Sequence, residues 1–221
     1  MAENGSVKVD LSRAAVFFDF DGTISTVDIG VHLLERLAAP GWHDFGHLFD
    51  AGEIGSRECM ELEWASIPDR FTELERRAVA AEIALDSGFG LLVEGLRAAG
   101  AEVAVVSDGF GFYVDDFIAP FAVPVFTNEV DFGTNTLRYP NAGRDCATCS
   151  ACGTCKPQVI EQARRRGRTT VFVGDGISDR HAARVADVLF AKAGLARWCS
   201  DQGIAHTHFD TLADVAAVLL P

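Results

Sequence analysis

Two carboxylates stand two positions apart near the start of the chain, directly after a short apolar run. Asp19 and Asp21 are followed by Gly22, which permits a sharp turn, and by Thr23. Such a pair can bind a divalent cation while one carboxylate attacks phosphorus and the other transfers a proton. A simple turn between a strand and a loop is the alternative, because Asp-Gly is common in turns.

A second pair of carboxylates, Asp175 and Asp179, follows another apolar run across a glycine-containing loop. Magnesium prefers carboxylate oxygens from a few well-placed residues, so this pair is a candidate for the metal site. Alternatively, Ser178 or Asp179 caps the helix that is expected to follow. The two interpretations are compatible.

Two further candidates could bind a phosphate group. Ser107, Asp108 and Gly109 offer a hydroxyl and backbone N–H groups after an apolar run, an arrangement that can hold a phosphate oxygen. Lys156 begins a predicted helix, where the helix dipole favours anions rather than cations. A lysine there is explained if it points at a carboxylate and a phosphate. Taken singly, a turn serine and a surface lysine are the alternatives.

The expected secondary structure places these residues together. Apolar runs at residues 14–18, 103–106 and 170–173 each end at a polar residue, which predicts a parallel sheet in an α/β fold. Open sheets of this kind bind ligands at the carboxyl ends of their strands. Helices are expected at residues 90–99, 156–166, 179–186 and 211–220.

The segment between the first two strands has a different pattern. Residues 29–85 carry periodic Leu, Phe, Ala and Trp without a strong strand, which predicts a helical cap over the sheet edge. Residues 125–139 predict a β-hairpin. We therefore expect a core domain formed by residues 1–27 and 86–221, and a cap domain formed by residues 28–85.

The order of these motifs is informative. Asp-x-Asp-Gly-Thr, then Ser, then Lys, then Gly-Asp-x-x-x-Asp resembles the four motifs of the haloacid dehalogenase superfamily, over nearly the whole chain. The resemblance is to subfamily IB. It implies a Rossmann-like parallel sheet with a small helical C1-type cap inserted after the first strand.

The resemblance also implies roles for the metal-binding and reacting residues. Asp19 would be the nucleophile that becomes an aspartyl-phosphate, and Asp21 the general acid and base. Magnesium would be bound by the carboxylates of Asp19 and Asp175 and by the backbone carbonyl of Asp21, with Asp179 supporting the metal. An Asp at position 21 favours a phosphatase over a dehalogenase.

The phosphoryl group would be held by Ser107 and Lys156, with Thr23, Asp108 and Gly109 beside them. Asp28 stands where phosphoserine phosphatases carry a substrate-reading Glu, but no clear counterpart of their cap arginine is present. Arg57 is the basic cap residue expected to reach the substrate. Ser107-Asp108-Gly109 also departs from the Ser-Gly-Gly of those enzymes.

Four cysteines precede Lys156 at a regular spacing: Cys146, Cys149, Cys152 and Cys155. This run is similar to that of methionine-salvage phosphatases acting on a methylthiopentenyl phosphate, and to that of phosphoethanolamine and phosphocholine phosphatases. The expected substrate is therefore a sugar-like or methylthiopentenyl phosphate. The cysteines could bind zinc or an iron–sulfur cluster, form disulfides, or stay reduced.

The formal net charge of -13 argues against nucleic acid and anionic membranes as partners. It also repels phosphate esters, so a local cation such as magnesium is expected at the site. No secretory signal or membrane span is recognised, and we expect a cytoplasmic protein that acts on a small phosphorylated metabolite. The sequence neither indicates nor excludes a homodimer. The alternatives are a phosphatase for phosphoserine, phosphocholine or phosphoethanolamine, a phosphotransferase, and a cysteine-based metal or redox module on a catalytically silent fold.

Overall fold

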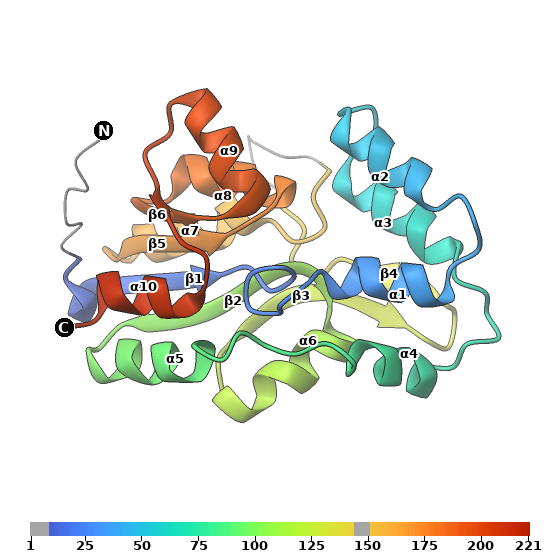
Figure 1. The fold of residues 1–221 in the computed structure, drawn as a ribbon, viewed down its shortest axis with the longest axis horizontal. Helices are drawn as coiled ribbons and strands as arrows, with labels where there is room; N and C mark the ends of the chain where they lie inside the picture. The colour runs from blue at the N-terminus through green and yellow to red at the C-terminus, as the bar shows by residue number, and fades with distance from the viewer. Residues whose placement is uncertain (1–8, 144–150) are drawn as a thin grey trace.

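The computed structural model describes residues 9–143 and 151–221, and its centre is a seven-stranded sheet with the order β4-β3-β2-β1-β5-β6-β7 (Figure 1). All neighbouring strands are parallel except β3 and β4, which form the expected antiparallel hairpin. The strands are β1 (Ala14–Phe18), β2 (Glu102–Phe110), β3 (Val125–Asp131), β4 (Thr136–Arg138), β5 (Thr169–Gly174), β6 (Val188–Ala191) and β7 (Thr207–His208).

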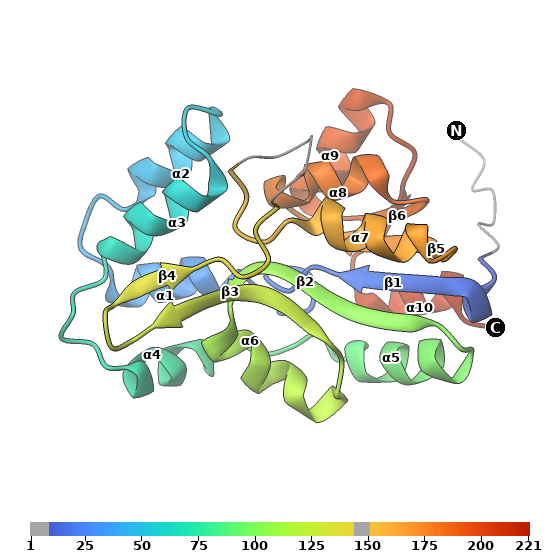
Figure 2. The same cartoon turned by 180° about the vertical axis from the view of Figure 1, so that it is seen from behind.

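Strand β1 is buried along its whole length because helices cover both faces of the sheet. Its alternate residues Ala14, Val16 and Phe18 join one apolar cluster, while Ala15 and Phe17 join a second cluster on the opposite face. The first face is covered by α5 (Phe89–Ala98), α6 (Gly111–Ile118) and α10 (Leu212–Leu219). The second is covered by α7 (Lys156–Arg165), α8 (Arg180–Val185) and α9 (Ala193–Gln202) (Figures 1 and 2).

Four helices fill residues 29–85, the segment that the sequence predicts to be helical. They are α1 (Ile29–Leu37), α2 (His43–Asp50), α3 (Ser56–Ala65) and α4 (Glu73–Ala80). The segment begins and ends at one place, where Ser25 and Leu85 form an antiparallel bridge. In Figure 2 the arrowhead of β1 points toward the side of the molecule on which these helices lie. The division into core and cap domains stays a prediction.

The second strand differs from the sequence-based expectation. Strand β2 does not stop before Ser107 but continues to Phe110, with a shift in its register against β3 between Val106 and Phe110. The hydroxyl of Thr127 donates to the carbonyl of Gly109 and so holds the continuation in place. The Ser-Asp-Gly segment is therefore part of an irregular strand, which the periodicity of its side chains does not reveal.

The other expected elements are present with small shifts at their ends. The helix expected at residues 179–186 begins as a 3₁₀ turn, Ile177–Asp179, before α8. Among the residues that the structure describes, no helix is both long enough and apolar enough to cross a membrane. An α/β fold with a mostly parallel sheet is thus confirmed.

Candidate active site

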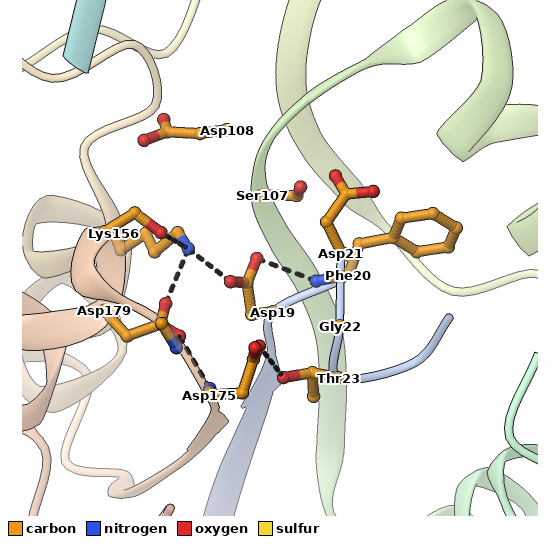
Figure 3. Close-up of polar contacts among 12 residues, drawn as sticks. Asp19, Phe20, Asp21, Gly22, Thr23, Ser107, Asp108, Lys156, Asp175 and Asp179 are labelled. Carbon is orange, nitrogen blue, oxygen red and sulfur yellow. Dashed lines mark hydrogen bonds and ion pairs between the residues drawn. The ribbon is translucent and has the colours of Figure 1, made fainter. Parts of the chain in front are cut away.

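A buried lysine connects three of the motifs at the carboxyl edge of the sheet. The ammonium of Lys156, at the start of α7, lies 2.8 Å from Asp19 Oδ2 and 2.6 Å from Asp179 Oδ1, and it donates to Ser178 Oγ at 3.0 Å (Figure 3). Burial alone would lower the pKa of Lys156, but the carboxylates of Asp179 and Asp19 outweigh it and raise that pKa. The side chain is therefore held as a charged ammonium despite being 1% exposed.

Asp19 follows directly after β1, and its carboxylate is fixed on both sides. Its Oδ1 accepts a hydrogen bond of 2.8 Å from the backbone N–H of Phe20, and its Oδ2 contacts Lys156. Burial, and next the negative charge of Asp179, raise the pKa of Asp19 well above its usual value. A cation near this carboxylate would relieve both effects.

The turn after Asp19 requires a glycine. Gly22 has a φ of +73°, and a Cβ there would lie 2.5 Å from Asp175 Oδ2. The next residue, Thr23, is fully buried and donates from its hydroxyl to Asp175 Oδ1 at 2.7 Å. Thr23, expected to bind the phosphate, thus holds Asp175 in place in this structure.

Asp179 binds the loop after β5 in addition to its ion pair with Lys156. Its Oδ2 accepts from the backbone N–H groups of Asp175 at 2.9 Å and of Gly176 at 3.1 Å. The expected cap on the following helix is not formed, because the Asp179 side chain makes no capping hydrogen bond to α8 and instead binds the N–H groups before the 3₁₀ turn Ile177–Asp179. Because both oxygens already have partners, Asp179 can support a metal ion mainly by orienting its neighbours.

The donor set fits a hard divalent cation. One carboxylate oxygen from each of Asp19, Asp175 and Asp179 lies within 4.8 Å of the others. Burial, followed by the charge of Asp179, raises the pKa of Asp175 to about 6. Magnesium would be held by Asp19 and Asp175 together with the backbone carbonyl of Asp21, and it would neutralise this repulsion.

The Asp21 carboxylate lies on the other side of the site, away from Lys156 (Figure 3). Its Oδ1 accepts from the N–H of Ile29 at 2.9 Å and its Oδ2 from the hydroxyl of Tyr113 at 3.0 Å. Burial and then the nearby Asp28 raise the pKa of Asp21 to about 8. A carboxyl that keeps its proton near neutral pH is suited to general acid catalysis.

Tyr113 is a site residue that sequence reasoning missed. It lies on α6, buried among the rings of Phe20, Phe110 and Phe112. Only its hydroxyl, which could not stay unpaired in a core, gave a signal that it needs a polar partner. Gly109 allows this contact, since a Cβ there would lie 2.5 Å from both Asp21 Oδ2 and the Tyr113 hydroxyl.

Asp28 and Ser107 both reach the cavity above the site. Asp28 caps α1 by accepting from the N–H of Val31 at 2.8 Å, and burial raises its pKa. Ser107 is 1% exposed, and its hydroxyl accepts from the N–H of Gly109 at 2.8 Å. A serine hydroxyl that accepts one hydrogen bond keeps its own proton to donate to a phosphate oxygen.

Asp108 and Arg57 are engaged elsewhere. Both carboxylate oxygens of Asp108 accept hydrogen bonds, from Thr154 N at 2.7 Å and from Ser56 Oγ at 3.0 Å, and Figure 3 shows its carboxylate apart from Asp19. Arg57 is not among the residues that line the cavity, and its guanidinium donates to the carbonyl of Cys152 at 3.1 Å. The structure does not bring Arg57 to the phosphate site.

The cysteine run is only partly described. Cys146 and Cys149 lie outside the described residues. Cys155 is buried, and its backbone N–H donates to the carbonyl of Asn141 at 2.9 Å, while Cys152 is half-buried. Zinc binding by the four cysteines stays a prediction.

Asp19, Asp21 and Asp175 line a cavity of about 340 Å³ between the sheet edge and α1 to α3. Among its described lining residues are seven acidic side chains and no Lys, Arg or His. The acidic ones are Asp19, Asp21, Asp28, Asp50, Glu63, Asp108 and Asp175. The apolar ones include Leu33, Leu34, Phe49, Met60, Trp64, Ile67 and Phe110.

Comparison with known proteins agrees with this geometry. The sequence model of the haloacid dehalogenase-like hydrolases matches residues 16–184. A 2-hydroxy-3-keto-5-methylthiopentenyl-1-phosphate phosphatase from an Exiguobacterium species is 31% identical, over 92% of this chain and 96% of the relative. One from Brevibacillus brevis is 28% identical, over 94% and 95% of the two chains.

The same fold occurs in solved structures of phosphoserine phosphatase. The structure described as a phospho-aspartyl intermediate analogue of that enzyme superposes with a TM-score of 0.74 at 18% identity, over 94% of this chain and 99% of the other. The chain therefore belongs to the haloacid dehalogenase-like hydrolase family. The expected family, fold and enzyme class, a phosphoric monoester hydrolase, are confirmed.

Proposed function

We propose that this enzyme hydrolyses a small phosphate monoester with magnesium, through an aspartyl-phosphate on Asp19. The observation that carries the proposal is the placement of Asp19. It follows β1 directly and lines the cavity, paired with the buried Lys156 ammonium and beside Asp175. Lysine and metal together would offset the negative field of the chain, which otherwise repels a phosphate dianion.

The first step forms a bond between an Asp19 carboxylate oxygen and phosphorus, while the bond from phosphorus to the ester oxygen breaks. Asp21, whose pKa is raised to about 8, gives its proton to the departing oxygen. In the second step the ionised Asp21 takes a proton from water, which attacks phosphorus and frees Asp19 and inorganic phosphate. Lys156 and Ser107 hold phosphoryl oxygens, and magnesium supplies charge neutralisation when bound.

The cavity favours an ester with an uncharged, partly apolar tail. Its wall includes Met60, Trp64 and Phe110, and its described lining has no cation that could pair with the carboxylate of phosphoserine. A methylthiopentenyl phosphate, the substrate class in the names of the relatives, suits this wall. The acidic lining also favours a second candidate, phosphocholine or phosphoethanolamine, whose cationic end would lie among these carboxylates.

The test is phosphate release from a panel of esters, with magnesium or with chelator, by wild type and by Asp19→Asn. The panel contains a methylthiopentenyl phosphate, phosphocholine, phosphoethanolamine and phosphoserine. Asp201→Asn, on the exposed end of α9, is the matched control. We expect magnesium-dependent release, highest with the methylthiopentenyl ester, that is lost in Asp19→Asn and kept in the control. Release that survives in Asp19→Asn would refute the proposed nucleophile.

Zinc binding by the cysteine run is a separate part of the proposal, and it does not enter the reaction. Metal analysis of protein purified without added zinc tests it. About one zinc per chain would support the prediction, whereas substoichiometric zinc and iron would reject it.

A further inference from the structure

The first turn of α3 lies directly against the segment that leads into α7. The backbone N–H of Arg57 donates to the carbonyl of Ala151 at 3.0 Å, and its guanidinium donates to the carbonyl of Cys152 at 3.1 Å. The approach is so close that a Cβ on Gly55 would lie 2.4 Å from the Cβ of Ala151. Residues 55–57 and 151–154 thus form one contact between the helical insert and the core.

Asp108 lies at the centre of this contact. Its Oδ2 accepts from the hydroxyl of Ser56, the first residue of α3, and its Oδ1 accepts from the N–H of Thr154. Asn128, which is fully buried, reinforces the second bond: it donates to the Asp108 carbonyl at 2.6 Å and accepts from the Thr154 hydroxyl at 3.2 Å. One carboxylate therefore links an insert helix to a tightly held residue of the core.

That core residue positions the phosphate-binding lysine. Thr154 stands two positions before Lys156, and its carbonyl accepts from the Lys156 backbone N–H at 3.0 Å. Lys156 in turn reaches Asp19 with its ammonium. A displacement of Thr154 would therefore shift the lysine relative to the reacting carboxylate, and displacements of this kind are costly for rate.

We propose that Asp108 is a positioning residue that couples the seating of α3 to the placement of Lys156, rather than a ligand of the phosphate. The proposal rests on the proposed function, and it explains an acidic residue beside Ser107, where a carboxylate facing the phosphate would repel it. Helix α3 also carries Met60 and Trp64, which line the cavity. Seating α3 would therefore close the cavity wall and fix the lysine in the same movement.

Three substitutions separate this role from direct contact with substrate. Asp108→Ala removes both hydrogen bonds, and Ser56→Ala removes only the bond to α3. Asp108→Asn preserves both, because its amide oxygen can accept from Thr154 while its amide nitrogen donates to Ser56 Oγ. The matched control is Ser200→Ala, whose hydroxyl bonds only to a carbonyl within α9 in the described structure.

We expect Ser56→Ala to lower kcat/KM by about 3- to 10-fold and Asp108→Ala by about 10-fold or more, as for one and for two hydrogen bonds. The double variant should be no worse than Asp108→Ala, and Asp108→Asn should stay within about 3-fold of wild type. Two results would overturn the proposal. Asp108→Asn could be as damaging as Asp108→Ala, or Ser56→Ala could match the Ser200→Ala control.

Hydrogen exchange of the resting protein gives a readout that needs no substrate. In Asp108→Ala the backbone N–H groups of Arg57 and Thr154 should both exchange their hydrogens faster than in wild type, although the two residues belong to different elements. In Ser200→Ala the exchange rate of neither group should change. If wild type hydrolyses no ester, the proposed function fails, while this exchange result still decides the coupling. Unchanged exchange at Arg57 in Asp108→Ala would refute it.

Discussion

Replacing Glu63 by Gln should raise the free energy of unfolding above neutral pH and have little effect below about pH 4.5. Glu63 lies on α3 and faces the cavity, where burial raises its pKa from 4.5 to about 7, although a hydrogen bond with Cys59 opposes the shift. The native state therefore holds a proton on this carboxyl that the unfolded chain releases. Its favourable contribution is complete below pH 4.5 and is lost as the pH rises through about 7.

The size of the effect follows from the shift. From 4.5 to about 7, at about 1.4 kcal/mol per pKa unit, the upper limit is about 3 kcal/mol. Glu63 is only partly buried, so solvent screening reduces the expected gain to about 1–2 kcal/mol at pH 8. Gln keeps the shape and an acceptor for the Cys59 thiol, so packing should be unchanged.

Urea unfolding of wild type and Glu63→Gln at pH 5, 6, 7 and 8 measures the difference in the free energy of unfolding at each pH. Glu58→Gln, on an exposed position of the same helix, is the matched control. The difference for Glu63→Gln should be about a quarter of its full value at pH 5, exceed about half of it at pH 6, and be nearly complete by pH 8. A difference that is flat with pH, or a loss of stability at pH 8, would refute the reasoning about this buried carboxyl.

Three further results are expected around the reacting residues. Lys156→Met should abolish phosphate release. It should also lower the free energy of unfolding, measured with urea at pH 7.5, by about 3–5 kcal/mol, because it leaves buried carboxylates without their partner. A decrease below about 1 kcal/mol would contradict the pairing. Asp21→Asn should lower kcat about 10²- to 10⁴-fold in a phosphate-release assay and leave the fold intact by circular dichroism; full activity would exclude it as the acid. Gly22→Ala should raise the magnesium concentration needed for half-maximal activity, because the new Cβ would meet Asp175. Gly203→Ala is the control: Gly203 also has a positive φ, but a Cβ there would have nothing within 4 Å, so the magnesium requirement should not change. Equal responses of the two variants would contradict the steric argument.

Local sequence patterns predicted the elements that place the motifs. The apolar run at residues 14–18 became β1 with those bounds, because every residue in a central parallel strand is buried on one face or the other. Asp19 and Asp175 follow two neighbouring parallel strands and so lie at one edge of the sheet, and Lys156 begins the helix that runs from this edge back to the start of β5. Spacing along the chain was sufficient for this part of the site.

Contacts between distant segments could not be predicted in the same way. The partners of Asp108 are 46 and 52 positions away, and the choice between a phosphate and these partners depends on how α3 seats against the core. Arg57 carries the right charge for a substrate contact, yet its side chain is drawn to backbone carbonyls of the neighbouring segment. Side-chain direction in a cap depends on tertiary packing, which periodicity does not encode.

The central claim is a covalent phosphoryl group on Asp19. The most direct measurement is a rapid acid quench of the enzyme during turnover of a ³²P-labelled ester with magnesium, followed by peptide mapping. The account predicts label in the peptide that contains Asp19, labile to hydroxylamine and absent from Asp19→Asn. Steady turnover without label on any peptide, or with label on a residue other than Asp19, would contradict it.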